Sequence, residues 1–405
     1  MLFRFSLYGF LKNQKYYEPF FILIFLEKGF SFFQIGLLIA FRELAVTILE
    51  VPSGALADSH GRRNCMVASM IGYIASFLFF SLSNSFLVLF FAMFLFAIGD
   101  AFRTGTHKAM IFKWLENENR LIEKTKVYGF TRSWSKTGTA LSSIIAAILV
   151  YKSGSFSTVF LFCIPPYLIN LFNLLSYPED LEAEDRGLKT IKESAVMLTA
   201  VFKETFKFKP LRKLIIETMG FQGVHKVTGD YIQPLIKILA VSVPIFAILK
   251  GDKGAALLAG LVYFFLALLG IFGARFSHKL VSASGSEDRS ASFLWISNLI
   301  CYILLIPFLF KGWFLAAILL FIVLELLQNL WRPIQIGRFD SVSSGSRRAT
   351  VLSIESQAKS FSAMLYAPLF GFGVDYFGLW FVGVTGAIVT LSIMLNRFKP
   401  ITAST

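Results

Sequence analysis

The sequence predicts an all-α polytopic membrane protein whose twelve transmembrane helices form two pseudo-symmetric six-helix bundles. Three observations predict this class. Hydrophobic residues make up 56% of the 405 residues and charged residues only 16%, whereas about 25% of an ordinary soluble domain is charged. Phe alone occurs 46 times, and the mean hydropathy is +0.66. A soluble fold could not cover so much apolar surface with so little charge.

Each predicted helix corresponds to an apolar stretch that reaches the roughly 20 residues needed to cross the hydrocarbon core. In chain order, the stretches lie near 5–28, 33–57, 65–83, 85–113, 126–151, 155–177, 211–239, 253–275, 291–310, 313–337, 349–371 and 374–396. The first stretch lacks a small-residue cleavage site, so we expect it to be a retained helix and not a signal peptide.

The net charge of +14 is distributed asymmetrically between the connections. If the N-terminus is inside, the inner connections carry most of the Lys and Arg, including Arg62, Arg63, Lys113, Arg120, Lys124, Lys126, the run from Arg186 to Lys213, Arg275, Lys279, Arg289, Arg338, Arg347, Arg348, Arg397 and Lys399. The outer connections carry Lys28, Lys152, Lys237, Lys250, Lys253 and Lys311. This positive-inside pattern predicts cytoplasmic termini. It also makes anionic lipid headgroups, and not nucleic acid, the expected partner of the basic surface.

A long polar interruption divides the stretches into two groups of six. It predicts an N-terminal bundle over 1–178, a cytoplasmic linker over 179–209 and a C-terminal bundle over 210–405. Within the linker, apolar residues recur at helical spacing and predict an amphipathic helix on the inner membrane surface: Leu188, Ile191, Ala195, Leu198, Phe202 and Phe206. The halves also resemble each other, since the Gly54 to Asp58 spacing after the second stretch returns as Gly273 to Ser277 after the eighth. Such duplication is typical of transporters with a central binding site.

The loop after the second stretch reads GALADSHGRR, from Gly54 to Arg63. This loop resembles the signature of the major facilitator superfamily, and the segments EVPSG, GDAFRTG and RSWSKTG resemble a bacterial, drug-efflux-like branch of it. The resemblance implies a conformational latch made of Gly54, Asp58, Gly61, Arg62 and Arg63. Asp58 would face the arginines and the positive end of the eleventh helix, near Ala349. An ordinary surface ion pair is the alternative. The resemblance also implies a location in the bacterial inner membrane.

Ionisable residues inside the stretches are the main functional candidates, because each costs at least roughly 2.5 kcal/mol near the centre of a membrane helix. They gather on single faces of the first, fourth, fifth, seventh, tenth and eleventh helices: Lys12, Lys15 and Glu18; Asp100, Arg103, His107 and Lys108; Arg132 and Lys136; Gln222, His225, Lys226, Asp230 and Gln233; Glu325, Gln328, Asn329 and Arg332; Glu355 and Lys359. The resemblance implies that helices one, four, seven and ten line the central cavity.

Two subsets of these residues suggest specific chemistry. Cationic and polar groups suited to a carboxylate or phosphate are the candidate substrate-binding residues: Arg103, His107, Arg132, Lys226, Arg332, Asn329 and Lys15. Carboxylates that can carry a proton when buried are the candidate coupling residues: Glu18, Asp100, Asp230 and Glu325. Pairing among the buried charges is an equally open interpretation. Neither metal nor cofactor is expected, because the histidines lack ligand spacing and Cys65, Cys163 and Cys301 form no CxxC.

The resemblance and these polar faces predict a secondary active transporter that moves a small organic solute, expected to be anionic, by alternating access. No Gly-rich nucleotide loop is present, so an ion gradient is the expected energy source, with protons favoured. Export and a monomeric state are expected. A proton antiporter for lipophilic cations is the alternative, and a nutrient sensor with a transporter fold is a minor one. An enzyme is not expected, because no Ser/His/Asp or HExxH pattern occurs.

Overall fold

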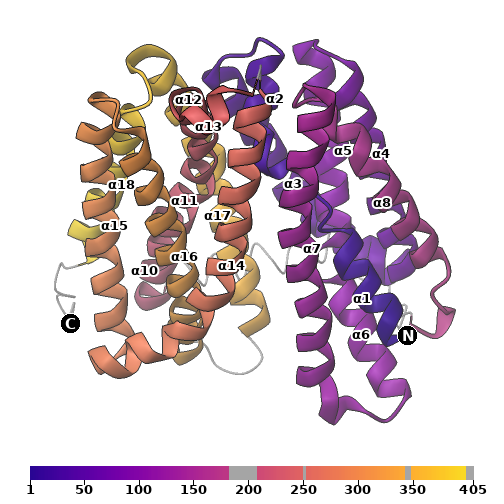
Figure 1. Ribbon diagram of the computed structural model, residues 1–405. Helices are drawn as coiled ribbons and strands as arrows, with labels where there is room; N and C mark the ends of the chain where they lie inside the picture. Colours follow the sequence, from indigo (N-terminus) through magenta and orange to yellow (C-terminus); the bar gives the residue numbers. More distant parts are fainter. Residues whose placement is uncertain (182–207, 250–251, 343–347, 398–405) are drawn as a thin grey trace. The chain divides into compact units, whose positions relative to one another are not determined.

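The computed structural model describes residues 1–181, 208–249, 252–342 and 348–397, and these residues form helices and no strands (Figure 1). The predicted amphipathic helix of the linker lies outside the described residues. The described chain divides into two compact units. Unit 1 contains Met1–Phe30, the described part of Phe41–Met197, and Ala240–Ala267; unit 2 contains Ser31–Ala40, the described part of Leu198–Leu239, and Leu268–Thr405 as far as it is described. Three of the described helices, α3, α12 and α14, therefore contribute residues to both units.

The helices of the first half are α1 (Leu2–Leu11), α2 (Phe21–Glu27), α3 (Phe32–His60), α4 (Arg62–Leu82), α5 (Phe86–Arg103), α6 (Thr106–Asn117), α7 (Lys124–Ser153) and α8 (Val159–Leu175). In unit 1, α4 packs against α5 and α8, and α1 packs against α7 and α8. Phe77 is fully buried where α4 faces its neighbours, and its ring meets those of Phe96, Phe160 and Tyr167. An aromatic core thus fixes the helices that carry the polar groups.

The sequence predicts one continuous first helix over 5–28, and this prediction is wrong. The α-helix stops at Leu11, and a 3₁₀ turn at Glu18–Phe20 precedes α2. Pro19 lies in the first turn of the new segment, where its missing N–H is tolerated. Just before it, the Asn13 side chain donates to the Gly9 carbonyl at 2.6 Å and so competes with helix continuation. The break places Lys12 and Lys15 in non-helical backbone.

Two glycines of α7 provide a test of how closely α1 packs against it. A Cβ at Gly138 would lie 2.6 Å from the Phe10 carbonyl oxygen, whereas a Cβ at Gly129 would meet nothing within 4 Å. We expect Gly138→Ala to destabilise the protein by about 1–3 kcal/mol through overpacking against rigid backbone. Gly129→Ala is the matched control and should be neutral or stabilising by up to about 1 kcal/mol, because alanine favours helix. Thermal unfolding in detergent measures both; equal effects would contradict the close crossing.

The helices of the second half are α10 (Lys209–Thr218), α11 (Val224–Thr228), α12 (Ile232–Ser242), α13 (Pro244–Ala247), α14 (Lys253–Ser284), α15 (Glu287–Phe310), α16 (Phe314–Val342), α17 (Arg348–Phe377) and α18 (Phe381–Arg397). Each predicted apolar stretch overlaps at least one described helix, although the first stretch is broken after Leu11. Among the described residues, six helical segments have both the length and the hydropathy to cross a membrane: Phe32–Glu50, Arg62–Leu82, Phe86–Asn117, Lys253–Gly270, Glu287–Phe310 and Phe314–Val342.

The seventh predicted helix is irregular at its centre. A π-helical turn at Met219–Gly223 joins α10 to α11, and a 3₁₀ turn at Gly229–Tyr231 joins α11 to α12. A Cβ at Gly223 would lie 1.9 Å from Ser362 Oγ of α17, so only glycine permits this approach. The buried Phe221 ring stacks on Trp331 of α16 with centroids 4.3 Å apart. These contacts hold the irregular segment firmly, and such π turns are frequent at functional sites.

Candidate functional site

In unit 1, an ion pair lies in the last turn of α5. The Arg103 guanidinium lies 3.2 Å from Asp100 Oδ1, one helical turn away. Tyr73 of α4 donates its hydroxyl to the same Asp100 oxygen at 2.6 Å, and Arg103 Nε donates to the Tyr73 oxygen at 3.1 Å. About a quarter of each charged side chain stays exposed. Both charges are therefore anchored by their partners, and each side chain stays partly exposed.

His107 lies beyond the break that separates α5 from α6. Gly105, at φ 78°, allows this sharp change of direction. The His107 ring stacks on Tyr8 of α1 with centroids 3.9 Å apart, and its Nε2 lies 3.3 Å from the Tyr177 hydroxyl. On the other side, the Lys12 ammonium lies 5.4 Å from the Tyr8 ring centroid. The histidine is thus held structurally, within a group of cations.

The broken segment after α1 is stabilised by side chains from neighbouring helices. Tyr167 of α8 donates to the Lys12 carbonyl at 2.9 Å, and Gln14 donates to the Gly138 carbonyl at 3.3 Å. Lys15 lies 3.8 Å from Glu18, whose side chain is about half exposed. The Lys12 carbonyl at the break is thereby satisfied, and the Gln14 side chain joins the broken segment to α7. Arg132 of α7 is exposed.

Unit 2 contains a different kind of polar group, centred on Glu325 of α16. Its Oε2 lies 2.8 Å from His225 Nε2 of α11, and Asn329 donates to its Oε1 at 2.9 Å. Gly270 and Gly273 of α14 leave room for Asn329, since a Cβ at Gly273 would meet the Asn329 Cβ at 2.9 Å. An imidazole and a carboxylate at this distance can share or exchange one proton.

The other predicted residues of unit 2 have separate contacts. Lys226 donates to Ser360 Oγ of α17 at 3.4 Å, and Asp230 accepts from Gln233 at 3.2 Å. Arg332 of α16 is exposed. The structure therefore brings Asn329 and Glu325 together with His225, while Asp230 lies in the 3₁₀ turn that follows α11.

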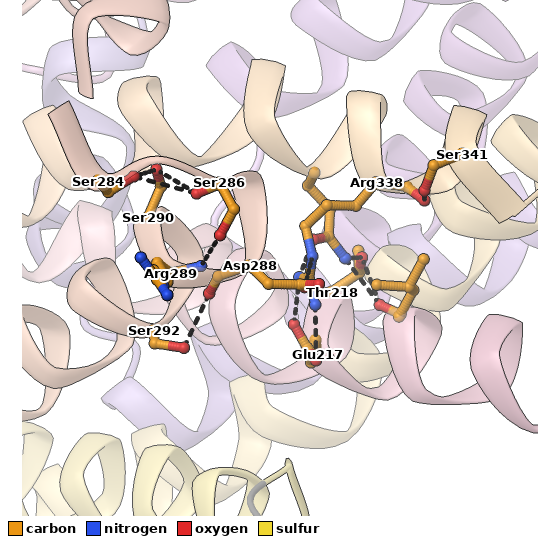
Figure 2. A network of polar contacts seen from close by, with 12 residues as sticks. Glu217, Thr218, Ser284, Ser286, Asp288, Arg289, Ser290, Ser292, Arg338 and Ser341 are labelled. Carbon is orange, nitrogen blue, oxygen red and sulfur yellow. Dashed lines mark hydrogen bonds and ion pairs between the residues drawn. The ribbon is translucent and has the colours of Figure 1, made fainter. Parts of the chain in front are cut away.

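A second polar network lies at the junction of α10, α15 and α16 (Figure 2). Arg338 Nη1 lies 2.5 Å from Glu217 Oε2, and its Nε lies 2.8 Å from Asp288 Oδ1. Glu217 is 1% exposed and Arg338 is 6% exposed. Gln335 accepts from Arg338 at 2.8 Å and donates to the Leu214 carbonyl at 3.0 Å. We name Glu217, Asp288, Gln335 and Arg338 the buried Arg338 network.

The placement of Arg338 corrects a sequence prediction. Its charge was expected in an inner connection after the tenth helix, but α16 continues to Val342 and buries it. The residues after Pro333 are more polar and end the apolar stretch, so hydropathy alone predicts a helix end that lies before the real end of α16. Glu217 is the residue in the sequence that indicates a buried cation, because a carboxylate inside an apolar stretch needs a partner. Among the described residues, no three His, Cys, Asp or Glu side chains converge as metal ligands.

The helical fold agrees with comparisons to known proteins. Residues 13–354 match the family model of the Major Facilitator Superfamily. The chain belongs to this superfamily. It is 22% identical over 390 residues to an uncharacterised transporter of the superfamily, YxaM of Bacillus subtilis (strain 168), with 95% of this chain and 92% of YxaM covered. The protein is therefore a multi-pass membrane protein and a secondary transporter.

Solved transporters share the superfamily fold along the whole chain. A mutant of the nucleoside transporter NupG superposes with a TM-score of 0.76 at 13% identity, covering 98% of both chains. A POT family transporter in complex with 5-aminolevulinic acid superposes with a TM-score of 0.72 at 15% identity, covering 97% of this chain and 95% of the transporter. A D-xylose-proton symporter superposes with a TM-score of 0.61 at 13% identity, covering 97% of this chain and 96% of the symporter. At these identities the likeness shows the fold alone.

The signature loop of the superfamily lies between α3 and α4. Gly61 adopts φ 96° and provides the turn that the motif requires. Arg63 of α4 donates to the Tyr177 carbonyl at 3.0 Å and pairs with Glu179 at 3.2 Å. Arg62 begins α4, and a Cβ at Gly54 would meet nothing within 4 Å. The Asp58 side chain lies outside what the structure describes, so the latch stays a prediction.

Proposed function

We propose that this protein moves a small organic anion across the bacterial inner membrane by alternating access, in exchange with protons and in the outward direction. The observation that carries the proposal is the pairing of Glu325 with His225 at 2.8 Å, a proton-exchanging group within the membrane helices. Among structures with this fold, one is described as a D-xylose-proton symporter, which supports protons as the coupling ion.

The charge of unit 1 supports an anionic substrate. The predicted binding cations of unit 1, Lys15, Arg103 and Arg132, outnumber its predicted proton carriers, Asp100 and Glu18. The guanidinium fork of Arg103 also matches the geometry of a carboxylate or phosphate. We include Lys226, Asn329 and Arg332 as binding candidates from unit 2. We further propose cytoplasmic termini, contact of the basic face with anionic lipid, and function as a monomer. The likeness of its motifs to an efflux branch supports export.

Arg103→Lys tests the anion site. It keeps the charge but removes the planar fork, so we expect the substrate concentration for half-maximal flux to rise by about tenfold or more. Flux is followed with a pH-sensitive dye inside proteoliposomes, over a panel of organic anions. Arg120→Lys is the matched control, because Arg120 pairs with Glu123 at 2.9 Å on the exposed end of the first half. Unchanged anion flux in Arg103→Lys would remove Arg103 from the site.

A second candidate function is proton antiport of lipophilic cations. The ion pair between Arg103 and Asp100 favours it, because an arginine already neutralised is less available to an anion. In that case Asp100 would contact the cation. Proton flux with lipophilic cations, and with none of the anions, would establish this function in place of the first.

A further inference from the structure

The start of α3 is attached to the end of α17 by a carboxylate. Asp375 Oδ1 accepts from the Phe32 backbone N–H at 2.9 Å, and Oδ2 accepts from the Phe33 N–H at 2.7 Å. The two oxygens of one side chain therefore satisfy two N–H groups at the beginning of a helix 29 residues long. The negative charge also lies at the positive end of that helix.

Glycines bring the two helices unusually close beneath this contact. A Cβ at Gly36 would lie 2.4 Å from the Ala367 carbonyl oxygen, and a Cβ at Gly371 would lie 2.2 Å from the Phe32 oxygen. Backbone meets backbone at both points, as in small-residue crossings of membrane helices. Rings flank the crossing, with Phe32 stacked on Tyr231 at 5.7 Å between centroids. Ile35 of α3, one residue before Gly36, is 2% exposed.

The contact between Asp375 and the start of α3 lies where it can take part in the transport cycle. Residues Ser31–Ala40 belong to unit 2, while the rest of α3 belongs to unit 1. Asp375 lies in unit 2 as well, but α3 belongs to the predicted N-terminal bundle and α17 to the predicted C-terminal bundle. A transporter that alternates must make and break contacts between its two bundles, because they move against each other once in each cycle. The helix α14 also contributes residues to both units, and within unit 1 a Cβ at Gly260 would meet the Ala147 Cβ and the Ser143 carbonyl of α7. That second crossing has small residues, but the contacts described there include no carboxylate.

We propose that Asp375 is a latch for one end of the transport pathway. The latch is closed when its carboxylate holds the start of α3 and must release before that end opens. This inference rests on the alternating access of the proposed function. By the predicted topology, the loop before α3 is extracellular, so the latch would close the outer side. The superfamily signature loop lies at the opposite end of α3.

The test uses Ile35→Cys as a reporter in a background where Cys65, Cys163 and Cys301 are replaced by serine. The protein is held in lipid nanodiscs, where a maleimide probe reaches both faces and membrane orientation does not matter. We expect Asp375→Asn to raise the rate of Ile35→Cys labelling by at least about tenfold, since two charge-assisted hydrogen bonds are lost. Asp375→Glu, which keeps the carboxylate, should return most of the protection. Gly371→Ala should also raise the rate, by forcing the crossing apart.

Glu27→Gln is the matched control. The Glu27 carboxylate also accepts from two consecutive N–H groups, those of Phe156 at 3.3 Å and Ser157 at 2.9 Å, but this contact joins two segments of the predicted N-terminal bundle. Labelling of Ile35→Cys should stay at the parent rate in this variant. An equal rise in Glu27→Gln, or no rise in Asp375→Asn, overturns the latch. The assay needs no substrate, so it decides the latch separately from the flux measurements that decide the proposed function.

Discussion

Arg338→Met is expected to lower the stability of the protein by about 3–5 kcal/mol, the usual cost of leaving one member of a buried ion pair without its partner. Methionine keeps most of the side-chain volume, so the loss reports charge and hydrogen bonding more than packing. Glu217 would be left as a carboxylate that is 1% exposed, in a region whose other contacts include the apolar side chains of Leu214 and Ile215. Thermal and denaturant unfolding of the purified protein in detergent would measure the change.

Two further variants separate the buried Arg338 network from a general effect of losing an arginine. Arg120→Met removes a comparable pair at the surface, where Arg120 donates through two nitrogens to Glu123 and lowers the pKa of that carboxyl group by hydrogen bonding. Exposed pairs contribute little to stability because solvent screens them, so little change is expected. Adding Glu217→Leu to Arg338→Met should recover most of the stability, because apolar residues can replace a buried pair. If Arg338→Met were as stable as the Arg120→Met control, the result would contradict the burial of the Arg338 charge.

Hydropathy predicts the helices of this protein well because membrane helices obey a strict constraint. Every backbone polar group in hydrocarbon must be satisfied internally, so a long apolar stretch has few alternatives to a helix. The break at Lys12–Tyr17 escaped this reasoning. Its hydrogen bonds come from Tyr167 and from the Gly138 carbonyl, and contacts more than a hundred residues away leave no local periodicity in the sequence.

In the candidate site too, the sequence predicts contacts within one helix but not contacts between helices. Helical spacing correctly placed Asp100 with Arg103, and Glu325 with Asn329, because residues three or four apart share a face. Spacing does not state which neighbouring helix that face meets. Tyr73 against Asp100, and His225 against Glu325, come from other helices and needed the structure. Of the four predicted proton carriers, Glu325 has a histidine among its described contacts, whereas the described contacts of Asp100 include Arg103, those of Glu18 include Lys15 and those of Asp230 include Gln233.

Glu325→Gln is expected to reduce accumulation driven by a pH gradient by at least roughly tenfold, because a gradient drives transport only through a group whose protonation favours one conformation. Glutamine keeps the shape and can still accept from Asn329, but it cannot take up a proton. Exchange of labelled substrate for unlabelled substrate across the membrane needs no net proton movement, so it should persist. Proteoliposomes with an imposed pH gradient measure the first process, and equal pH on both sides measures the second.

The partner of Glu325 sharpens this test. His225→Gln removes the imidazole 2.8 Å away while leaving the carboxylate, so coupling should survive with its pH dependence displaced, whereas Glu325→Gln should show no pH dependence at all. Glu116→Gln is the control, since Glu116 pairs with Lys113 at 3.4 Å and is largely exposed. If both processes fell together in Glu325→Gln, the residue would be needed for the conformational change itself. If neither fell, the coupling group would lie elsewhere, and Asp230 and Glu18 would be the next carboxylates to neutralise.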